Sequence, residues 1–376
     1  MINYKQKIIF ICSEFPPGPG GIGNHACNLA NEIVKHLPID VLTVSDYTNK
    51  NSSRKFDKRQ PFYIHRFQRY KYSLQTYFFR IIQIIKHINK NNYSHCILSG
   101  YFSLLMFTII KLFNNEIIFI AVLHGSELVQ SSLIKNFFLK QNLNNINIII
   151  TVSNYTKKLL PKKKINKQKV FVIPNGVNEA LLNVNYNNTI NEKMIGTPCL
   201  VTLGSITNRK GQINLINVLS EVIKKYPKVH YHCVGLPIEK KKITERVKQL
   251  KLKPYVTIHG FIPNEKLDSI FHQTDILIML SQNKIRNDVE GFGIAILEAN
   301  LFGVPAIGSI NTGIEDAIVN RKTGMLVNPY SINEILDAIE HIMKNREKLS
   351  INAVKWANQH TWGNISKRYL NVIENA

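Results

Sequence analysis

The chain has 376 residues, with 48 Lys and Arg against 25 Asp and Glu, which gives a formal net charge of +23. This length predicts two domains, because a domain typically spans about 100–200 residues, and a hydrophobic fraction of 44% excludes a disordered or collagen-like chain. The five cysteines argue against a disulfide scaffold or a CxxC zinc site and fit a reducing cytoplasm, because their spacing is wide and unpatterned: Cys12, Cys27, Cys96, Cys199 and Cys233.

The positive charge is concentrated in the first half of the chain. Residues 1–190 carry 24 basic and 8 acidic side chains, a net of +16, whereas residues 191–376 carry a net of +7. A basic surface of this kind favours a polyanionic partner, either nucleic acid or an anionic membrane face. A/T-biased coding, which enriches Lys, Asn and Ile, is an alternative source of the charge but does not predict its asymmetry.

No segment is expected to be exported or to span a membrane. The apolar run at 8–12 is too short for the core of a signal peptide. The most apolar stretch, 101–113, is interrupted by Lys111 and is shorter than the about 18 residues of a transmembrane helix. Any membrane contact is therefore expected to be peripheral.

In the first half, apolar runs typical of buried parallel strands alternate with helices and loops. A strand at 7–12 is followed by a Gly- and Pro-rich loop at 16–23 and a helix from about Asn24 to His36. This alternation predicts a doubly wound parallel sheet. Further strands are expected at 38–44, 96–99, 117–123 and 148–152.

The pattern stops near 170–177, and the Asn-rich segment 178–196 is expected to be a linker. The sequence therefore predicts an α/β protein of two Rossmann-like domains, 1–178 and 196–361. Ligands of such folds bind at the carboxyl edges of the sheets, so we expect a cleft between the two domains. The elements of the second domain are a helix at 212–225 and strands at 199–204, 229–235, 256–260, 276–280 and 305–308.

The strongest chemical signal is the segment that begins at Glu290 and ends at Glu298. Gly291 and Gly293 allow a ligand to approach the backbone closely, and a helix is expected to begin near Ile294. The free N–H groups of its first turn would face a ligand, and Glu298 would add a second carboxylate. Carboxylates accept hydrogen bonds and amides donate them, so this arrangement suits a polyhydroxylated ligand.

Glu290 and Glu298 form an E-x7-E motif, and with it the chain resembles retaining glycosyltransferase family 4, whose members have the two-domain GT-B fold. One such pair of glutamates is weak on its own, whereas several markers in family order are specific. The resemblance covers nearly the whole chain and implies that a helix of about 362–376 packs back on the N-terminal domain. The other markers are the Gly-rich loop 18–23, His-Gly-Ser-Glu at 124–127, Val-Ser-Asn-Tyr at 152–155, Ile-Pro-Asn-Gly-Val at 173–177, Arg-Lys-Gly at 209–211, Gly-Val-Pro at 303–305 and Thr-Gly-Ile-Glu at 312–315.

The resemblance implies roles for individual residues. Glu290 would contact hydroxyls of the transferred sugar, Glu298 would hold the ribose diol of the sugar nucleotide, and Lys210 would neutralise its diphosphate. His124 would lie near the anomeric carbon as the second catalytic residue beside Glu290. The β-phosphate or the acceptor would meet the backbone of Gly20, Gly21 and Gly23. The remaining donor contacts would be Ser205, Arg209, Gly291, Phe292, Gly293 and Ile294.

No metal or other cofactor is expected, and the implied donor is a UDP- or GDP-sugar. The sequence holds no Asp-x-Asp pair, and a lysine with helix amides can stabilise a departing nucleoside diphosphate. One position departs from the family pattern: members usually carry Arg directly after the Gly that ends the strand, where this chain has Ser205 after Gly204. We hypothesise that Arg209 supplies the missing charge and shares the diphosphate with Lys210.

Several of these residues also have ordinary structural interpretations. His124 follows a strand and Glu127 is suited to cap the next helix, while Gly313 and Glu315 fit a simple loop. The Gly-rich loop is not a G-x-G-x-x-G fingerprint, so NAD binding is not expected. The other histidines have no metal-ligand spacing.

The segment 70–113 is the expected contact with an acceptor or a membrane. Its apolar residues have roughly helical spacing, which also fits a core-facing helix: Tyr77, Phe78, Ile81, Ile82, Ile85 and Ile88. Anionic lipid is favoured by the basic residues around it, which are Arg54, Lys55, Lys58, Arg59, Arg66, Arg69 and Lys71. A second basic cluster comprises Lys162, Lys163, Lys164, Lys167 and Lys169.

The sequence thus predicts a retaining glycosyltransferase that moves a sugar from a nucleotide donor to a lipid-linked or glycan acceptor in bacterial surface polysaccharide or lipopolysaccharide synthesis. We expect it at the cytoplasmic face of the cell membrane. A GT-B enzyme with a small soluble acceptor, or a sugar-nucleotide epimerase, would share the donor site without needing a basic face. A basic nucleic-acid-binding protein is a remote alternative that lacks any recognised signature and leaves the two glutamates unexplained, so no nucleic-acid partner is expected.

Overall fold

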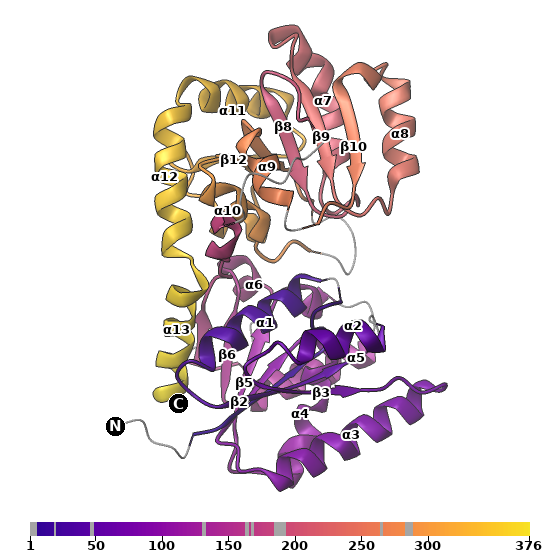
Figure 1. The fold of residues 1–376 in the computed structure, drawn as a ribbon, viewed down its shortest axis with the longest axis vertical. Helices are drawn as coiled ribbons and strands as arrows, with labels where there is room; N and C mark the ends of the chain where they lie inside the picture. The colour runs from indigo at the N-terminus through magenta and orange to yellow at the C-terminus, as the bar shows by residue number, and fades with distance from the viewer. Residues whose placement is uncertain are drawn as a thin grey trace. The chain divides into compact units, whose positions relative to one another are not determined.

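The chain folds into two compact units, each an α/β structure around a parallel sheet (Figure 1). Unit 1 comprises residues 1–175 and 362–376, and unit 2 comprises residues 176–361. The fold class predicted from the sequence is confirmed by this pair of parallel-sheet units. The computed structural model describes residues 6–18, 20–45, 49–129, 133–161, 165–166, 169–183, 193–263, 266–282 and 289–376.

Unit 1 contains a seven-stranded parallel sheet with the strand order β3-β2-β1-β4-β5-β6-β7. The order reverses at β1, as in a doubly wound sheet. Nearly all residues of β1, β2, β4 and β5 are buried, because helices cover both faces of the sheet. The strands are β1 (Ile8–Cys12), β2 (Ile39–Val44), β3 (Tyr63–Phe67), β4 (His95–Ser99), β5 (Ile118–Leu123), β6 (Ile148–Thr151) and β7 (Val170–Val172).

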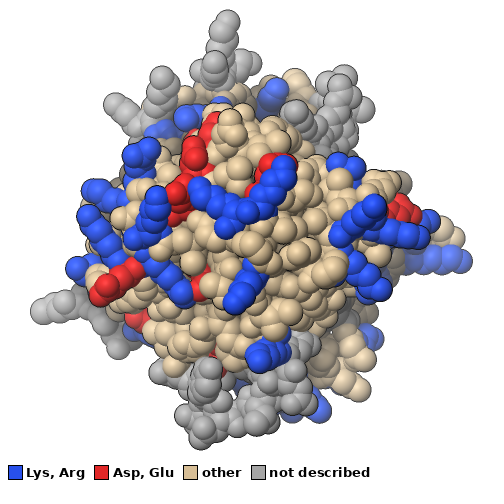
Figure 2. Space-filling view, turned by 90° about the horizontal axis from the view of Figure 1, so that it is seen from above, with Lys and Arg blue, Asp and Glu red and all other residues tan. Residues whose placement is uncertain are grey.

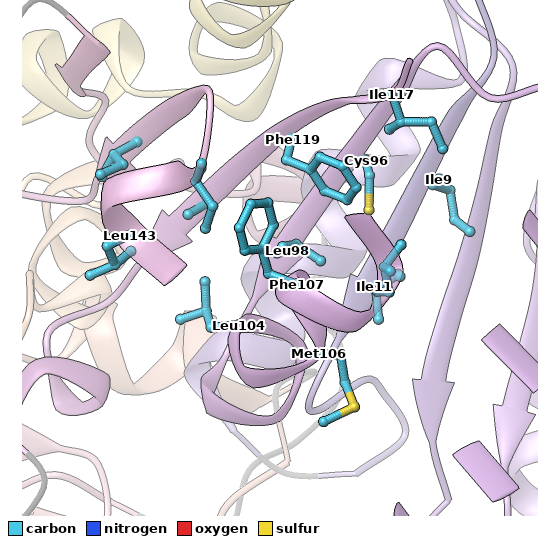
Figure 3. Close-up of a cluster of buried hydrophobic side chains, with 14 of the residues drawn as sticks. Ile9, Ile11, Cys96, Leu98, Leu104, Met106, Phe107, Ile117, Phe119 and Leu143 are labelled. Atoms are coloured by element: carbon cyan, nitrogen blue, oxygen red, sulfur yellow. The ribbon is translucent and has the colours of Figure 1, made fainter. Parts of the chain in front are cut away.

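Helices α3, α4 and α5 pack side by side on the sheet of unit 1, and α1 packs against α13 (Figure 1). The core between the sheet and α3–α5 includes the edge-to-face pair Phe107 and Phe119, whose ring centroids are 5.0 Å apart (Figure 3). The helices are α1 (Gly21–Ile33), α2 (Lys50–Asp57), α3 (Ser73–Lys90), α4 (Tyr101–Phe113), α5 (Leu133–Asn145), α6 (Asn154–Lys158) and α13 (Trp362–Glu374).

Unit 2 contains a six-stranded parallel sheet with the order β10-β9-β8-β11-β12-β13, which reverses at β8. Its strands are β8 (Cys199–Leu203), β9 (His230–Val234), β10 (Val256–Gly260), β11 (Ile276–Met279), β12 (Ala306–Ser309) and β13 (Gly324–Val327). Its helices are α7 (Gln212–Lys225), α8 (Lys240–Gln249), α9 (Leu267–His272), α10 (Ile294–Leu301), α11 (Ile332–Lys344) and α12 (Arg346–Gln359).

The elements that differ from the sequence-based expectation include two strands and the start of one helix. Strand β3 was not predicted, because Tyr63–Phe67 is an edge strand that mixes apolar with polar residues and is mostly half-buried. Strand β13 was not predicted either, because it is short and begins at a glycine. Helix α1 begins at Gly21 rather than near Asn24. The sequence predicts a later start because glycines have low helix propensity. Glycine is nevertheless required at Gly23, where the helix approaches the backbone of Phe15.

The surface charge and the lengths of the helices are the two properties that matter for contact with a membrane. On the face drawn in Figure 2, Lys and Arg side chains outnumber Asp and Glu and the two kinds are interspersed, in keeping with the net charge of +23. Within the described residues, no helix combines the length and the apolar character that crossing a membrane requires.

Candidate active site

The E-x7-E segment of unit 2 lies at the carboxyl end of β11 and runs into α10. Gly293 precedes the first residue of α10 with a φ of 95°, a left-handed backbone conformation that favours glycine. The side chain of Phe292 is buried in the core, so only its backbone can serve a ligand. Helix α10 ends before Gly303, which has a φ of 72° and leaves room for Ser350 of α12.

Two cations converge on Glu290 from the loop between β8 and α7. Lys210 Nζ lies 2.9 Å from Glu290 Oε2, and the guanidinium of Arg209 bonds to the same oxygen. Glu290 is buried, and although burial alone would raise its pKa, Lys210 and Arg209 hold that pKa below its ordinary value. The carboxylate is therefore ionised at neutral pH.

Glycines bring the lysine to this position. Gly211 adopts a left-handed conformation with a φ of 74°, and a Cβ there would lie 1.7 Å from Leu280 O at the end of β11. Lys210 then runs back over Gly204, where a Cβ would lie 3.1 Å from Lys210 Cε. Ser205 follows Gly204 directly, and its carbonyl accepts a hydrogen bond from Gln212 Nε2 at 3.2 Å. Arg209 and Lys210 thus supply two positive charges in the same loop as Ser205, which is uncharged.

Glu298 is the second carboxylate of this site. Burial raises its pKa to about 7, and the charge of Lys210 opposes that rise. The two glutamates therefore share one lysine but differ in protonation: Glu290 stays ionised, whereas Glu298 titrates near neutral pH. Two carboxylates, two cations and the N-terminus of α10 together offer acceptors for hydroxyls and a positive region for phosphate oxygens.

Gly313 and Glu315 have local structural roles. The Gly313 N–H donates to Glu290 O at 2.9 Å, and a Cβ on Gly313 would lie 2.1 Å from the carbonyl carbon of Gly291. Glu315 Oε1 accepts a hydrogen bond from the Asn311 N–H at 2.8 Å. The loop that contains them therefore packs against the Glu290–Gly291 backbone and fixes its course.

The candidate residues of unit 1 lie where its parallel strands end. Ser99 ends β4 and His124 follows β5, and Ser99 Oγ lies 3.0 Å from His124 Nε2. Ser13 follows β1, and its N–H donates to Ser99 O at 3.0 Å. Ser13 Oγ in turn accepts a hydrogen bond from the Phe102 N–H at 3.0 Å. Three strand ends are thereby joined to the first turn of α4.

His124 is held in a neutral state. Burial lowers its pKa to about 4, so at neutral pH its ring donates or accepts hydrogen bonds but carries no charge. The ring of His25, from α1, lies edge-on to it with centroids 4.8 Å apart. His25 is fully buried, and its Nε2 lies 3.2 Å from the hydroxyl of Tyr369 in α13.

The Gly-rich loop of unit 1 wraps around a carboxylate. A Cβ on Gly20 would lie 2.1 Å from Glu14 Oε2. Burial raises the pKa of Glu14, and a hydrogen bond from the Gly23 N–H partly offsets this rise. An anionic group close to Gly20 or Gly23 would therefore lie near the Glu14 carboxylate. At Gly21, in contrast, a Cβ would point into open space. This chemistry favours hydroxyl groups over a phosphate as neighbours of the loop.

Two other predicted features have structural explanations. Glu127 is buried, and its Oε2 accepts a hydrogen bond from the His124 N–H at 3.1 Å, so it braces the turn after β5. Lys169 donates to the Asn144 carbonyl at 2.9 Å and therefore ties two segments of unit 1 together. Lys162, Lys163, Lys164 and Lys167 lie outside the described residues.

The structure thus gathers the candidate residues into two groups. In unit 2, Arg209 and Lys210 contact Glu290, while Gly204 lies against Lys210 and is followed directly by Ser205. In unit 1, His124 meets Ser99 and His25, while the Gly-rich loop meets Glu14. Sequence reasoning missed Ser99, His25, Tyr369 and Glu14, and the available signal was that Ser99 ends a strand and Glu14 follows one.

Two family models match the chain, one in each half. The model for Glycosyltransferase Family 4 matches residues 19–181, and the model for Glycosyl transferases group 1 matches residues 188–357. The chain is a glycosyltransferase of the family 4 type. In this glycosyltransferase, the first match falls mainly in unit 1, and the second matches most of unit 2.

Curated relatives match the glycosyltransferase over part of their length. An uncharacterized 41.2 kDa protein in the cps region of Klebsiella pneumoniae is 27% identical over 199 residues, which are 51% of each chain. The GDP-mannose-dependent alpha-(1-6)-phosphatidylinositol monomannoside mannosyltransferase of Mycobacterium tuberculosis is 26% identical over 152 residues, or 40% of each chain. The matches thus span about half the length of these relatives or less.

A solved structure shares the fold over the full length. Anabaena HepE in complex with UDP superposes with a TM-score of 0.78 at 17% identity, covering 99% of this chain and 100% of that one. The glycosyltransferase therefore has the GT-B fold of two parallel-sheet α/β units.

Proposed function

We propose that this glycosyltransferase transfers a sugar from a nucleoside-diphosphate donor bound by unit 2 to an acceptor bound by unit 1, with retention of anomeric configuration. The observation that carries the proposal is the convergence of Arg209 and Lys210 on Glu290, just before the N-terminus of α10, with Glu298 about one turn inside that helix. A UDP- or GDP-sugar fits this group, because UDP is bound in HepE and GDP-mannose is named for the mycobacterial relative.

Each group has a chemical task in this proposal. The diphosphate gains negative charge as the glycosidic bond breaks, and Arg209, Lys210 and the amides of α10 stabilise it without reorganisation. Glu290 and Glu298 accept hydrogen bonds from sugar and ribose hydroxyls respectively. His124 is neutral, so it orients a hydroxyl instead of competing for the diphosphate.

Retention is proposed to proceed on one face of the sugar. The departing phosphate oxygen takes the proton of the acceptor hydroxyl as the new C–O bond forms and the old one breaks. In this route no protein side chain forms a bond to the sugar. Its direct test is the anomeric configuration of the product by NMR: an α-linked donor should give an α-linked product, and an inverted product would contradict retention.

The acceptor is proposed to be a lipid-linked or polysaccharide intermediate of the bacterial surface, handled at the cytoplasmic face of an anionic membrane. The similarity to a protein of the Klebsiella cps region and to a phosphatidylinositol monomannoside mannosyltransferase supports this class. The net charge of +16 in residues 1–190 supports an anionic surface on the acceptor side.

The first experiment is a calorimetric and thermal-shift panel of UDP, GDP, ADP and their sugars. At least one nucleotide should bind, and Lys210→Ala should weaken it. Lys225→Ala is the matched control, because Lys225 forms an exposed ion pair with Glu340 elsewhere in unit 2. If no nucleotide binds the wild-type chain and Glu298→Ala has no effect on sugar transfer, the proposed function is wrong.

A further inference from the structure

Six exposed hydrophobic side chains, which we call the aromatic rim, lie at one end of the layer formed by α3, α4 and α5 in unit 1. Its six side chains are large, hydrophobic and between 41% and 86% exposed. Exposed apolar groups gathered in one place are unusual on a surface with no partner. The rim comprises Tyr72, Leu74, Tyr77 and Phe78 at the start of α3, and Phe137 and Phe138 in α5.

Contacts between helices show that these residues lie at the same end of the layer. Tyr77 meets Phe102 of α4, with ring centroids 5.7 Å apart. On the other side of α4, Asn142 Nδ2 donates to Leu104 O at 2.8 Å and Lys111 Nζ donates to Asn145 O at 3.2 Å. Helices α4 and α5 therefore run in the same direction.

This direction fixes the level of the α5 aromatics. Because a helix rises about 1.5 Å per residue, and Asn142 is level with the residues after Leu104, Phe138 is level with the first turn of α4. That turn contains Phe102, which Tyr77 contacts. The aromatic groups of α3 and α5 thus flank the N-terminal end of α4.

The rim lies next to the group that contains His124. Phe102 donates its N–H to Ser13 Oγ, the Ser13 N–H bonds to Ser99 O, and Ser99 Oγ bonds to His124. The aromatic side chains that flank the start of α4 therefore lie near the carboxyl edge of the sheet, where unit 1 is proposed to take its acceptor.

The helices that carry the rim have charge of one sign. Over their full lengths, α3, α4 and α5 contain six Lys or Arg residues and no Asp or Glu. Arg69, Lys71 and Lys140 are exposed beside the aromatic groups, and Lys71 Nζ lies over the Tyr72 ring at 5.6 Å from its centroid. Aromatic side chains with basic neighbours match the interface of an anionic bilayer, where rings enter the headgroup layer and cations meet lipid phosphates.

We infer that the aromatic rim is the surface by which this protein docks on an anionic lipid bilayer. This inference deepens the proposed function, because it places the acceptor group of unit 1 at the level of lipid headgroups. A lipid-linked acceptor then reaches His124 without leaving the membrane. Docking is reversible, since it uses side chains at helix ends and basic residues rather than an inserted segment.

The experiment is co-sedimentation of the full chain with vesicles of phosphatidylcholine alone or with added phosphatidylglycerol. The wild type should bind the anionic vesicles at least tenfold more strongly than the neutral ones, and less as salt rises. Leu74→Ser with Phe78→Ser, and Phe137→Ser with Phe138→Ser, should each lower that binding at least tenfold. Arg69→Glu with Lys71→Glu should lower it by a similar factor at low salt.

The chain offers matched controls. Leu112 and Phe113 are 74% and 59% exposed at the opposite end of α4, so serine at both should change binding less than twofold. Lys86→Glu with Lys90→Glu is the charge control at the far end of α3. Circular dichroism confirms that each variant is folded, and nucleotide binding tests the proposed function separately.

Three outcomes would overturn the inference. The wild type does not bind anionic vesicles, or the Leu112 and Phe113 variant loses as much binding as the rim variants, or light scattering shows that the rim variants convert a dimer to a monomer. The last result would assign the rim to self-association. Intact vesicle docking with no nucleotide binding would instead reject the proposed function and leave the docking surface in place.

Discussion

Lys210 and Glu290 form an ion pair at 2.9 Å in unit 2, and Arg209 bonds to the same carboxylate oxygen. In the proposed site, the Glu290 carboxylate therefore pairs with both of the cations that are proposed to bind the diphosphate. A nucleotide must displace Glu290 from them, which releases the carboxylate to accept hydrogen bonds from a sugar.

This competition predicts an unusual effect of Glu290→Gln. Without the carboxylate, a nucleoside diphosphate no longer competes with Glu290 for Lys210 and Arg209, so its affinity should rise by about three- to tenfold. Sugar transfer should fall, because the hydrogen bonds to the sugar weaken. Calorimetry with UDP or GDP measures the first effect, and the free nucleoside, which lacks phosphates, should show no gain. Weaker binding of the diphosphate to the variant would contradict the displacement.

Arg209 is predicted to contribute to diphosphate binding as Lys210 does. A hydrogen bond to a charged group is worth about 1.5–3 kcal/mol, so Arg209→Ala and Lys210→Ala should each weaken binding by about 10- to 100-fold. Lys225→Ala should leave binding unchanged. If Arg209→Ala also leaves binding unchanged, Arg209 does not compensate for the uncharged residue Ser205.

Nucleotide affinity should depend on pH through Glu298. Its pKa is raised to about 7 by burial, so the carboxylate is ionised above pH 7 and protonated well below it. An ionised carboxylate is the better acceptor for a ribose diol, and affinity should therefore fall as pH decreases from about 8 to 6. Glu298→Gln should bind more weakly at pH 8 and lose this dependence. A parallel pH profile for both proteins would show that another group titrates.

Gly313→Ala should destabilise unit 2. The new Cβ would lie 2.1 Å from the Gly291 carbonyl carbon, which is backbone and cannot move aside as a flexible side chain can. We expect a loss of about 1–3 kcal/mol in the free energy of unfolding. Gly21→Ala is the control, because nothing lies within 4 Å of that position and alanine favours the start of α1. Equal melting temperatures for the two variants would disprove the close approach.

Tyr369→Phe should destabilise unit 1. It removes the hydroxyl that lies 3.2 Å from Nε2 of the fully buried His25, and an unpaired buried polar group costs about 1–3 kcal/mol. Tyr330→Phe removes a hydroxyl from an exposed pair with Gln282 and should cost much less. Denaturant unfolding of both variants measures the difference.

The predictable elements are those whose own residues determine them. Helix α7 has the predicted bounds, Gln212–Lys225, because its apolar face is continuous and Gly211 marks its start. Strand β3 and strand β13 could not be predicted in this way. The residues of β3 mix apolar and polar side chains that are mostly half-buried, and β13 has four residues and begins at a glycine.

The residues of the candidate site also differ in whether the sequence alone predicts them. Glu290, Glu298 and Lys210 are recognisable because each lies in a short local motif, and Arg209 followed from a charge missing at Ser205. The contact between His25 and His124 could not be predicted, since about a hundred residues separate them and only the packing of α1 beside the end of β5 brings the rings together. The occupation of Arg209 and Lys210 by Glu290 is likewise a product of tertiary structure.

The return of α13 to unit 1 sets an order for biosynthesis. Residues 1–175 leave the ribosome first, yet the unit to which they belong also needs Trp362–Glu374. Until those residues are made, His25 lacks both Trp362 and Tyr369 as neighbours. Unit 2 is continuous in sequence, whereas unit 1 stays incomplete until the residues that follow unit 2 are made. A chain truncated before Trp362 should therefore have a protease-resistant unit 2 beside a protease-sensitive unit 1.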